Sequence, residues 1–179
     1  TCSWEGRGAA GVMTSGRTNY AGKEALLVQD RTAAWNGATK ALNAKAFVPG
    51  KEYSFSVNVS YFDGDLTDTF YLKLQYTDAN GDTQYDSIAT AKGVQGKWVQ
   101  LANTNYTIPA GAKDMQIYVE TADTTNNFYI DEAIGAVAGT VISGAGAIDV
   151  PETLIPGDVN LDGVIDGFDL AAAKRGLAA

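Results

Sequence analysis

The clearest gap in this sequence is histidine, which is absent from all 179 residues. Its absence excludes a Ser-His-Asp triad, a Cys-His pair and the zinc sites that depend on histidine. Cysteine is almost absent as well, because Cys2 is the only one. No intrachain disulfide and no four-cysteine metal site can therefore form. A lone thiol with no base partner is expected to be inert.

Positive charge and long apolar runs are also scarce. The chain has 13 Lys and Arg against 21 Asp and Glu, a net charge of −8. Nucleic acids and anionic membrane surfaces attract basic patches, so we expect neither as a partner. No apolar run reaches the roughly 18 residues of a membrane-spanning helix. A hydrophobic fraction of 45% still supplies a globular core, and the acidic charge is compatible with a neutral ligand or with calcium.

Most of the chain has the pattern of β-strands. Apolar and polar residues alternate in residues 53–59, 71–76 and 115–120, as is typical of strands with one buried face. Asn80-Gly81 lies between two such segments and predicts a hairpin, because both residues tolerate positive φ. No amphipathic helix interrupts this region. We therefore predict an all-β, antiparallel β-sandwich over residues 1–138.

The composition changes twice after this region. Residues 139–156 are rich in Gly, Ala, Val and Thr and end in a segment bounded by Pro151 and Pro156. They are predicted to form a linker, partly flexible and partly extended. Residues 157–179 differ again and form a third segment.

The third segment contains a calcium-loop pattern. Calcium prefers oxygen ligands, which a twelve-residue loop supplies at positions 1, 3, 5, 7, 9 and 12, with glycine at position 6. Gly163 stands at position 6 here, and Ile165 at position 8 is the usual apolar anchor. A solvated acidic loop is the plainer alternative. The predicted ligands are Asp158, Asn160, Asp162, the Val164 carbonyl, Asp166 and Asp169.

The surroundings of this loop resemble one repeat of a dockerin. No helix precedes the loop, and helix-forming residues 170–175 follow it. The resemblance implies Ca²⁺ binding and attachment to a cohesin of a scaffoldin, with Gly167 and Phe168 helping to read the partner and Lys174 and Arg175 nearby. It also implies a secreted, extracellular, cellulosome-associated bacterial protein. Dockerins normally carry two such repeats, and this sequence shows one.

A second resemblance covers roughly residues 4–134. It rests on an ordered set of segments, namely Trp4-Glu5-Gly6-Arg7-Gly8, Tyr20-Ala21-Gly22, residues 31–37, residues 49–56, Gly96-Lys97-Trp98, Tyr118-Val119-Glu120 and residues 128–131. Together they resemble a family-22 carbohydrate-binding module. That implies a non-catalytic jelly roll that binds xylan, or xylo-oligosaccharides, and sometimes mixed-linkage β-glucan. Its role would be to hold an attached plant-cell-wall hydrolase on its substrate.

The same resemblance implies a ligand cleft made by Arg7, Trp35, Tyr85, Tyr118 and Glu120. Aromatic rings can stack on the apolar faces of sugars, and charged groups can bond their hydroxyls. Tyr118 and Glu120 are two residues apart on one predicted strand, so they share a face. The plainer alternatives are a structural ion pair for Arg7, core packing for Trp35, and core or plain surface for Tyr85.

Three further expectations concern Trp98, Asp131 and the alternative functions. Trp98 begins a strand-like segment and is predicted to lie in the core. Asp131 matches the carboxylate that, by resemblance, would ligate a structural calcium in the sandwich. Two other functions stay open: a structural or thermostabilising module without a ligand, and a small glycoside hydrolase, for which Glu120 would need a second carboxylate such as Glu5 or Asp86.

Overall fold

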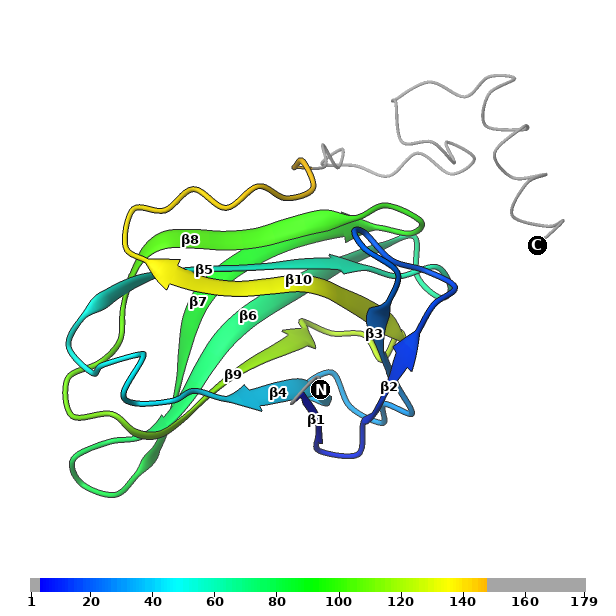
Figure 1. Cartoon of the computed structure of the whole chain (residues 1–179). Coiled ribbons are helices and arrows are strands. Elements are labelled where there is room, and N and C mark those ends of the chain that lie inside the picture. Colours follow the sequence, from blue (N-terminus) through cyan, green and yellow to red (C-terminus); the bar gives the residue numbers. More distant parts are fainter. Residues whose placement is uncertain (1–3, 148–179) are drawn as a thin grey trace, which may run out of the picture. The chain divides into compact units, whose positions relative to one another are not determined.

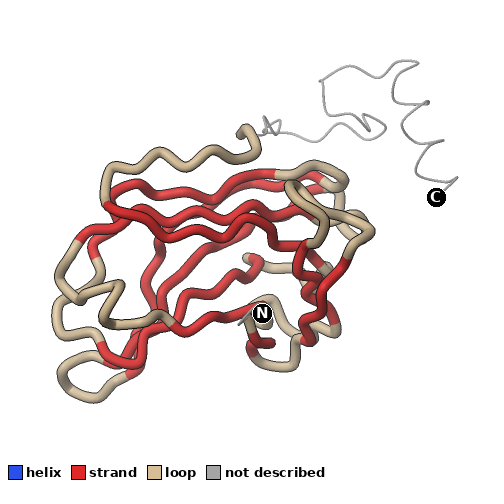
Figure 2. The backbone as a smooth tube through the Cα atoms, viewed as in Figure 1, coloured by secondary structure: helices blue, strands red, loops and turns tan. Residues whose placement is uncertain are grey.

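A computed structural model describes residues 4–147 of the chain, which form ten strands and no helix (Figures 1 and 2). This part of the chain accordingly has no helix long and apolar enough to cross a membrane. The chain divides into two compact units, Thr1–Ile148 and Asp149–Ala179. The predicted calcium loop belongs to the second unit and lies outside the described residues.

The strands pair into two five-stranded sheets, and every pairing is antiparallel. Sheet A has the order β1 (Glu5–Arg7), β4 (Gly37–Ala41), β9 (Lys113–Thr121), β6 (Thr67–Thr77) and β7 (Thr83–Val94). Sheet B has the order β2 (Gly11–Ser15), β3 (Ala25–Gln29), β10 (Phe128–Val137), β5 (Glu52–Ser60) and β8 (Val99–Thr107). The predicted two-sheet sandwich is confirmed.

The core lies between the two sheets and follows the predicted alternation. On β6 every second residue from Asp68 to Leu74 is buried, while the residues between them are half-buried. Inward-facing side chains from β5 and β6 are almost completely buried, and they are Phe55, Val57, Val59, Phe70, Leu72 and Leu74. This packing gives each sheet one inner face, so side chains of opposite parity form an outer face.

The predicted hairpin joins β6 to β7. Gly81 has φ of 90°, a conformation that favours glycine. Asp78 fixes the turn, because its carboxylate accepts hydrogen bonds from the backbone N–H groups of Asn80 (2.8 Å) and Asp82 (3.0 Å). The turn sets the register in which Tyr85 of β7 lies opposite Gln75 of β6. The hairpin thereby delivers Tyr85 to the outer face of sheet A.

The first residues of the predicted linker are bound to sheet B. We call residues 139–145 the strap; it leaves the end of β10 and runs beside β8 (Figure 1). Four hydrogen bonds attach it: Gly139 N to Thr104 O (2.7 Å), Ser54 Oγ to Thr140 O (2.7 Å), Gln100 Nε2 to Ile142 O (2.8 Å) and Ala145 N to Asn58 Oδ1 (2.9 Å). The strap is therefore an ordered part of the sandwich unit.

Trp98 does not lie in the core, so the prediction for it is wrong. It lies just before β8, is half-buried, and is not one of the buried core residues. Its ring packs against Tyr20, with 6.0 Å between the ring centroids. The apolar pattern that starts at Trp98 enters the core only from Val99, which is 3% exposed.

Candidate functional site: a cleft on the outer face of sheet A

All five residues predicted to bind a ligand line one cleft. The cleft has a volume of about 420 Å³, and Lys73 is its sixth lining residue beside Arg7, Trp35, Tyr85, Tyr118 and Glu120. These residues come from β1, the loop after β3, β6, β7 and β9. The structure thus assembles side chains that are more than 100 positions apart in the sequence.

The strand register explains how the centre of the cleft is built. On β9, Val119 points into the core, so its neighbours Tyr118 and Glu120 point outward. Lys73 of β6 pairs with Tyr118 across the sheet. On the other side, Arg7 pairs with Gly37 of β4. A Cβ at Gly37 would lie 1.9 Å from the carbonyl oxygen of Val119, so this position needs glycine.

Two of the three aromatic side chains that line the cleft are exposed to solvent, and the third is buried. Trp35 is 54% exposed and Tyr85 is 59% exposed, so neither is a core residue. Tyr118 is 1% exposed and meets Tyr85 edge to face, with centroids 6.5 Å apart. Exposed aromatic rings of this kind are available to stack on the apolar face of a sugar ring.

Arg7 lies over the aromatic rings. Its Cζ is 4.0 Å from the Tyr118 centroid, 5.6 Å from that of Tyr85 and 5.8 Å from that of Trp35, so it makes cation–π contacts. Among the described residues Arg7 forms no ion pair, and its buried Nε has no hydrogen-bond partner. The plainer alternative, a structural ion pair for Arg7, is therefore not what residues 4–147 contain.

Burial keeps the Tyr118 hydroxyl protonated. Desolvation raises the pKa of Tyr118 to about 12, and the nearby charge of Glu120 adds to the rise, while Arg7 opposes it. At neutral pH the hydroxyl is therefore a neutral group that can both donate and accept hydrogen bonds.

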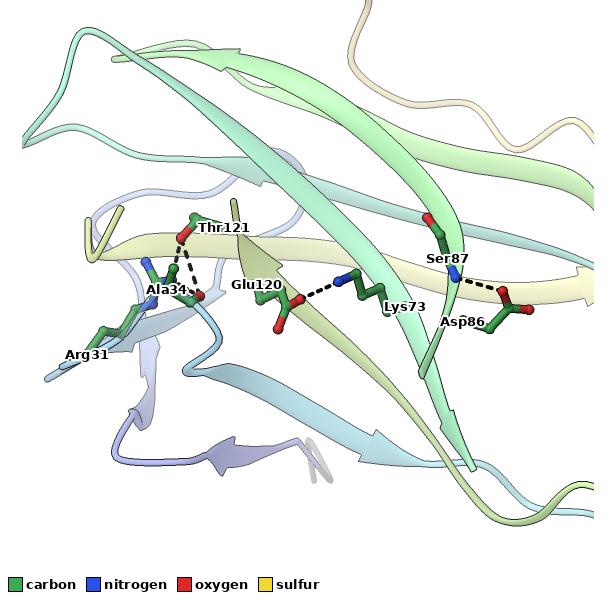
Figure 3. Close-up of polar contacts among 7 residues, drawn as sticks. All are labelled: Arg31, Ala34, Lys73, Asp86, Ser87, Glu120 and Thr121. Carbon is green, nitrogen blue, oxygen red and sulfur yellow. Dashed lines mark hydrogen bonds and ion pairs between the residues drawn. The ribbon is translucent and has the colours of Figure 1, made fainter. Parts of the chain in front are cut away.

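Glu120 is held by Lys73, a residue that the sequence analysis missed. Lys73 Nζ lies 2.7 Å from Glu120 Oε1, and the two side chains point toward each other from β6 and β9 (Figure 3). The alternation in residues 71–76 does place Lys73 on the outward face of its strand. It does not reveal that this strand pairs with β9.

The loop that carries Trp35 is fixed by Arg31. Arg31 is 7% exposed, and its guanidinium donates to Asn36 O (2.8 Å), Ala34 O (2.7 Å) and Thr121 Oγ1 (2.6 Å), and also to Asn126 O. Figure 3 shows Arg31, Ala34 and Thr121 converging beside the end of β9. Desolvation lowers the pKa of Arg31 to about 10, so Arg31 remains charged at neutral pH.

A glycine supports the Trp35 ring from the β1–β2 turn. Gly8 has φ of +66°, and a Cβ there would lie 2.5 Å from Trp35 Cζ3 and 2.2 Å from Asn36 Nδ2. The ring therefore rests against backbone that only glycine can provide. Gly8 thus holds one side of Trp35 in place, while most of the surface of Trp35 stays exposed.

Asp131 already has partners within the sandwich. Its Oδ2 accepts the backbone N–H groups of Tyr20 (2.8 Å) and Ala21 (2.9 Å), and its Oδ1 accepts that of Glu132 (2.8 Å). Within residues 4–147 no group of three His, Cys, Asp or Glu could hold a metal ion. The role of Asp131 as a calcium ligand stays a prediction.

The other predicted calcium ligands lie outside the described residues. They are Asp158, Asn160, Asp162, Val164, Asp166 and Asp169, together with the neighbouring Gly167, Phe168, Lys174 and Arg175 that the dockerin resemblance singled out. Cys2 is outside the described residues as well.

Glu120 is the only carboxylate among the cleft-lining residues of the described part of the chain. Asp86 accepts a 2.7 Å hydrogen bond from the Tyr106 hydroxyl of β8 and so ties sheet A to sheet B. Glu5 is exposed and does not line the cleft. Glu5 and Asp86, the two carboxylates considered as partners for Glu120, therefore do not line the cleft.

Comparison with known proteins identifies the family of the sandwich. Residues 1–126 match the family described as carbohydrate binding domain. "Endo-1,4-beta-xylanase Y" of Acetivibrio thermocellus is 54% identical over 172 residues, or 96% of this chain and 16% of that protein. "Xylanase/beta-glucanase" of Ruminococcus flavefaciens is 36% identical over 192 residues, or 98% of this chain and 24% of that protein. The chain thus spans a small part of these relatives.

Solved structures agree with the fold and narrow the family. The C-terminal family 22 carbohydrate binding module of Clostridium thermocellum Xyn10B is 56% identical, has a TM-score of 0.78, and covers 79% of this chain and 90% of its own. A structure described as "Xylan-Binding Domain from CBM 22" is 57% identical with the same TM-score and coverage. The matches to xylanases fall on this module. This chain therefore belongs to the carbohydrate binding domain family, and its sandwich is a non-catalytic module of family 22.

Proposed function

We propose that the sandwich binds xylan and thereby keeps an attached hydrolase on its substrate. The observation that carries this proposal is the convergence of two exposed aromatic rings, Trp35 and Tyr85, on a cleft with a fixed carboxylate, Glu120. Similar proteins support it: two relatives are named as xylanases, one structure is described as a xylan-binding domain, and another is described as complexed with xylohexaose.

The chemistry of the cleft suits a neutral polysaccharide. Trp35 and Tyr85 offer faces for successive sugar rings, while Arg7, Tyr118 and Glu120 offer donors and acceptors for hydroxyl groups. Arg7 already contacts Tyr118, Tyr118 contacts Tyr85, and Lys73 contacts Glu120. Few side-chain rotamers therefore need to be fixed when a ligand binds. Preorganisation of this kind favours affinity for a flexible polymer.

The benefit to the organism would come from tethering. A binding module that shares a chain with a hydrolase raises the concentration of that enzyme at the polymer surface without any new chemistry. Insoluble plant-wall polymer lies outside the cell, so the parent protein is proposed to be secreted. The hydrolase is proposed to lie elsewhere in the parent protein, because the relatives are several times longer than this chain.

The tail is proposed to add a second tether. Its loop, Asp158 to Asp169, has the ligand spacing of a calcium site, and its resemblance to a dockerin repeat indicates a cohesin as partner. Calorimetric titration of the whole chain with Ca²⁺, compared with the Asp158→Ala variant, tests this part. Saturable binding that the variant loses supports a loop site, whereas binding that the variant retains points to the sandwich and Asp131.

Titration with xylohexaose, with reducing sugar followed on the same sample, tests the main proposal. Saturable heat without new reducing ends supports a binding module. Absence of heat with xylohexaose and with a mixed-linkage β-glucan oligosaccharide would favour a structural module without a ligand. The β-glucan arm is included because one relative is named for both polymers. A stronger response to that ligand would reassign the preferred polymer.

A further inference from the structure

We propose that Lys73 is a positioning residue of the cleft: it acts through Glu120, orienting that carboxylate toward the bound ligand. This inference rests on the proposed function, because it concerns the same cleft. It concerns a residue that the resemblance to known modules did not single out.

Lys73 is placed to hold Glu120 by the regular alternation of β6. Buried and half-buried residues alternate from Asp68 to Leu74, and the register shift beside Lys73 leaves out Ile88 of β7, so β6 itself is uninterrupted there. Leu72 is buried in the core, whereas Lys73 lies on the cleft face opposite Tyr118. Its ammonium then reaches along the sheet to Oε1 of Glu120, 2.7 Å away.

The burial of Glu120 makes this contact necessary. The Glu120 side chain is 8% exposed, and a nearly buried carboxylate is unstable unless it is paired and hydrogen-bonded. Within residues 4–147, Lys73 is its ion-pair partner, and the bond occupies Oε1. Oε2 carries no hydrogen bond from any described residue, so the pairing leaves one oxygen with a fixed direction to accept from a ligand.

Lys73 is itself held in place, which distinguishes it from a mobile surface lysine. Its Nζ lies 4.8 Å from the centroid of the Tyr71 ring, a cation–π contact, and its side chain is only 27% exposed. Tyr71 in turn pairs with Glu120 in the register between β6 and β9. The three side chains therefore form one contact group, and moving the lysine would release the carboxylate.

Two other roles would give different results in the same experiment. Lys73 could touch the ligand directly through its remaining N–H groups, or it could serve stability alone. A residue that acts through Glu120 loses its effect when Glu120 is already changed, because a double-mutant cycle isolates the coupling between the two. A direct contact keeps its effect in that background, and a structural role changes unfolding and not affinity.

The experiment measures xylohexaose affinity of Lys73→Met, Glu120→Gln, the double variant and Lys73→Arg by calorimetry. Affinity electrophoresis in gels containing soluble xylan extends the measurement to weak binders. Lys51→Met, at an exposed lysine at the start of the β5 region, controls for the loss of one positive charge. Urea unfolding of every variant reports stability separately.

The expected result is that Lys73→Met weakens binding roughly tenfold, a coupling typical of residues in one network, and that it adds no further loss to Glu120→Gln. Lys73→Arg should restore most of the affinity, since it keeps the charge beside Glu120, and Lys51→Met should bind like the parent. Additive losses, or full affinity in Lys73→Met, would overturn the proposal while wild-type binding still upholds the proposed function. If the wild-type chain itself binds no xylohexaose, both proposals fall together.

Discussion

The outer faces of sheets A and B differ in the size of their side chains and in what covers them. On sheet A the face holds the large residues Trp35, Tyr85 and Arg7, which stand around an open cleft. On sheet B the outward row of β5 is entirely small and polar and is no more than 1% exposed, and it consists of Ser54, Ser56, Asn58 and Ser60. The strap covers much of this row.

The small polar row explains why the strap can lie so close to sheet B. Ser54 and Asn58 bond the strap backbone directly, and Gln100 of β8 bonds both Ser56 Oγ (2.7 Å) and Ile142 O (2.8 Å). A Cβ on Gly144 would lie 2.4 Å from Gln100 Cδ, so the approach is tight. Buried polar groups need partners, and most of this row has them; Asn58 Nδ2 is an exception within the described residues.

The two outer faces of the sandwich differ in whether their side chains remain open to a ligand. On sheet A, polar and aromatic groups support one another and still leave Trp35 and Tyr85 available to a ligand. On sheet B, most of the polar groups of the β5 row are hydrogen-bonded to the protein's own chain. Alternation along a strand is the same in both cases, so the chemistry of the outward residues decides which face can bind.

The largest expected effect tests a residue that belongs to neither face. Arg31→Met should lower the free energy of unfolding by about 3 kcal/mol, because it leaves several buried carbonyl groups without a donor. Xylohexaose affinity should fall as well, since Arg31 fixes the loop of Trp35. Urea unfolding and calorimetry measure the two effects. Arg17→Met, at an exposed arginine, is the matched control, and an equal unfolding midpoint in both variants would contradict the expectation.

The next effect should fall on the open face alone. Trp35→Ala should weaken xylohexaose binding by about 30-fold, the loss expected for an aromatic residue at the centre of a binding site. Stability should change little, since the ring is 54% exposed. Met13→Ala on β2 removes a side chain of similar exposure, 51%, from the other sheet and should leave affinity intact. Equal affinity of both variants would place the ligand elsewhere.

A change on the covered outer face of sheet B should have the opposite effect to Trp35→Ala: it should lower stability and leave affinity unchanged. Gly144→Ala forces Gln100 away from Ser56 and Ile142, which should cost about 1 kcal/mol of unfolding free energy and no affinity. Gly146→Ala is the control, because a Cβ there meets nothing within 4 Å. Thermal and urea unfolding of the pair measure the difference. Loss of xylan affinity in Gly144→Ala would mean that the two faces are coupled, contrary to the comparison.

The sequence predicted what depends on local patterns. Alternation located β5, β6 and β9, and Asn80-Gly81 located the hairpin. Strand periodicity and positive-φ turns depend on the identities of neighbouring residues, so a local pattern reveals them. The set of five cleft residues came from the resemblance to a family, and the structure does bring them together. Their role in binding a ligand stays a prediction that the variants above test.

The features that the sequence analysis missed depend on long-range pairing. Lys73 meets Glu120 only because β6 lies beside β9, a pairing between strands about 40 residues apart that no local pattern specifies. The strap looked like a linker because its Gly, Ala, Val and Thr carry no strand alternation. Its anchors, Ser54, Asn58 and Gln100, contact it through long-range hydrogen bonds that no local pattern specifies. Trp98 was misplaced because apolarity alone does not separate the edge of a sheet from its core.

The smallest expected effect is a difference in pH dependence between the two faces. The pKa of Tyr118 is raised to about 12, mainly by burial, whereas a tyrosine in the unfolded chain titrates near 10. Between about pH 10 and pH 12 the unfolded chain therefore releases a proton that the folded chain keeps. The stability that Tyr118 contributes is present below about pH 10 and is lost as the pH rises toward 12.

Tyr118→Phe should consequently lose stability less steeply than the parent over this range. Some slope should remain, because burial also raises the pKa values of Tyr61 and Tyr106. Urea unfolding at about pH 9 and about pH 11 measures the difference. Gly144→Ala is the matched control, because the strap contacts of Gln100, Ser56 and Asn58 do not titrate and its cost should be the same at both pH values. A slope in Tyr118→Phe equal to that of the parent would show that the cleft face does not hold this phenol in its neutral form.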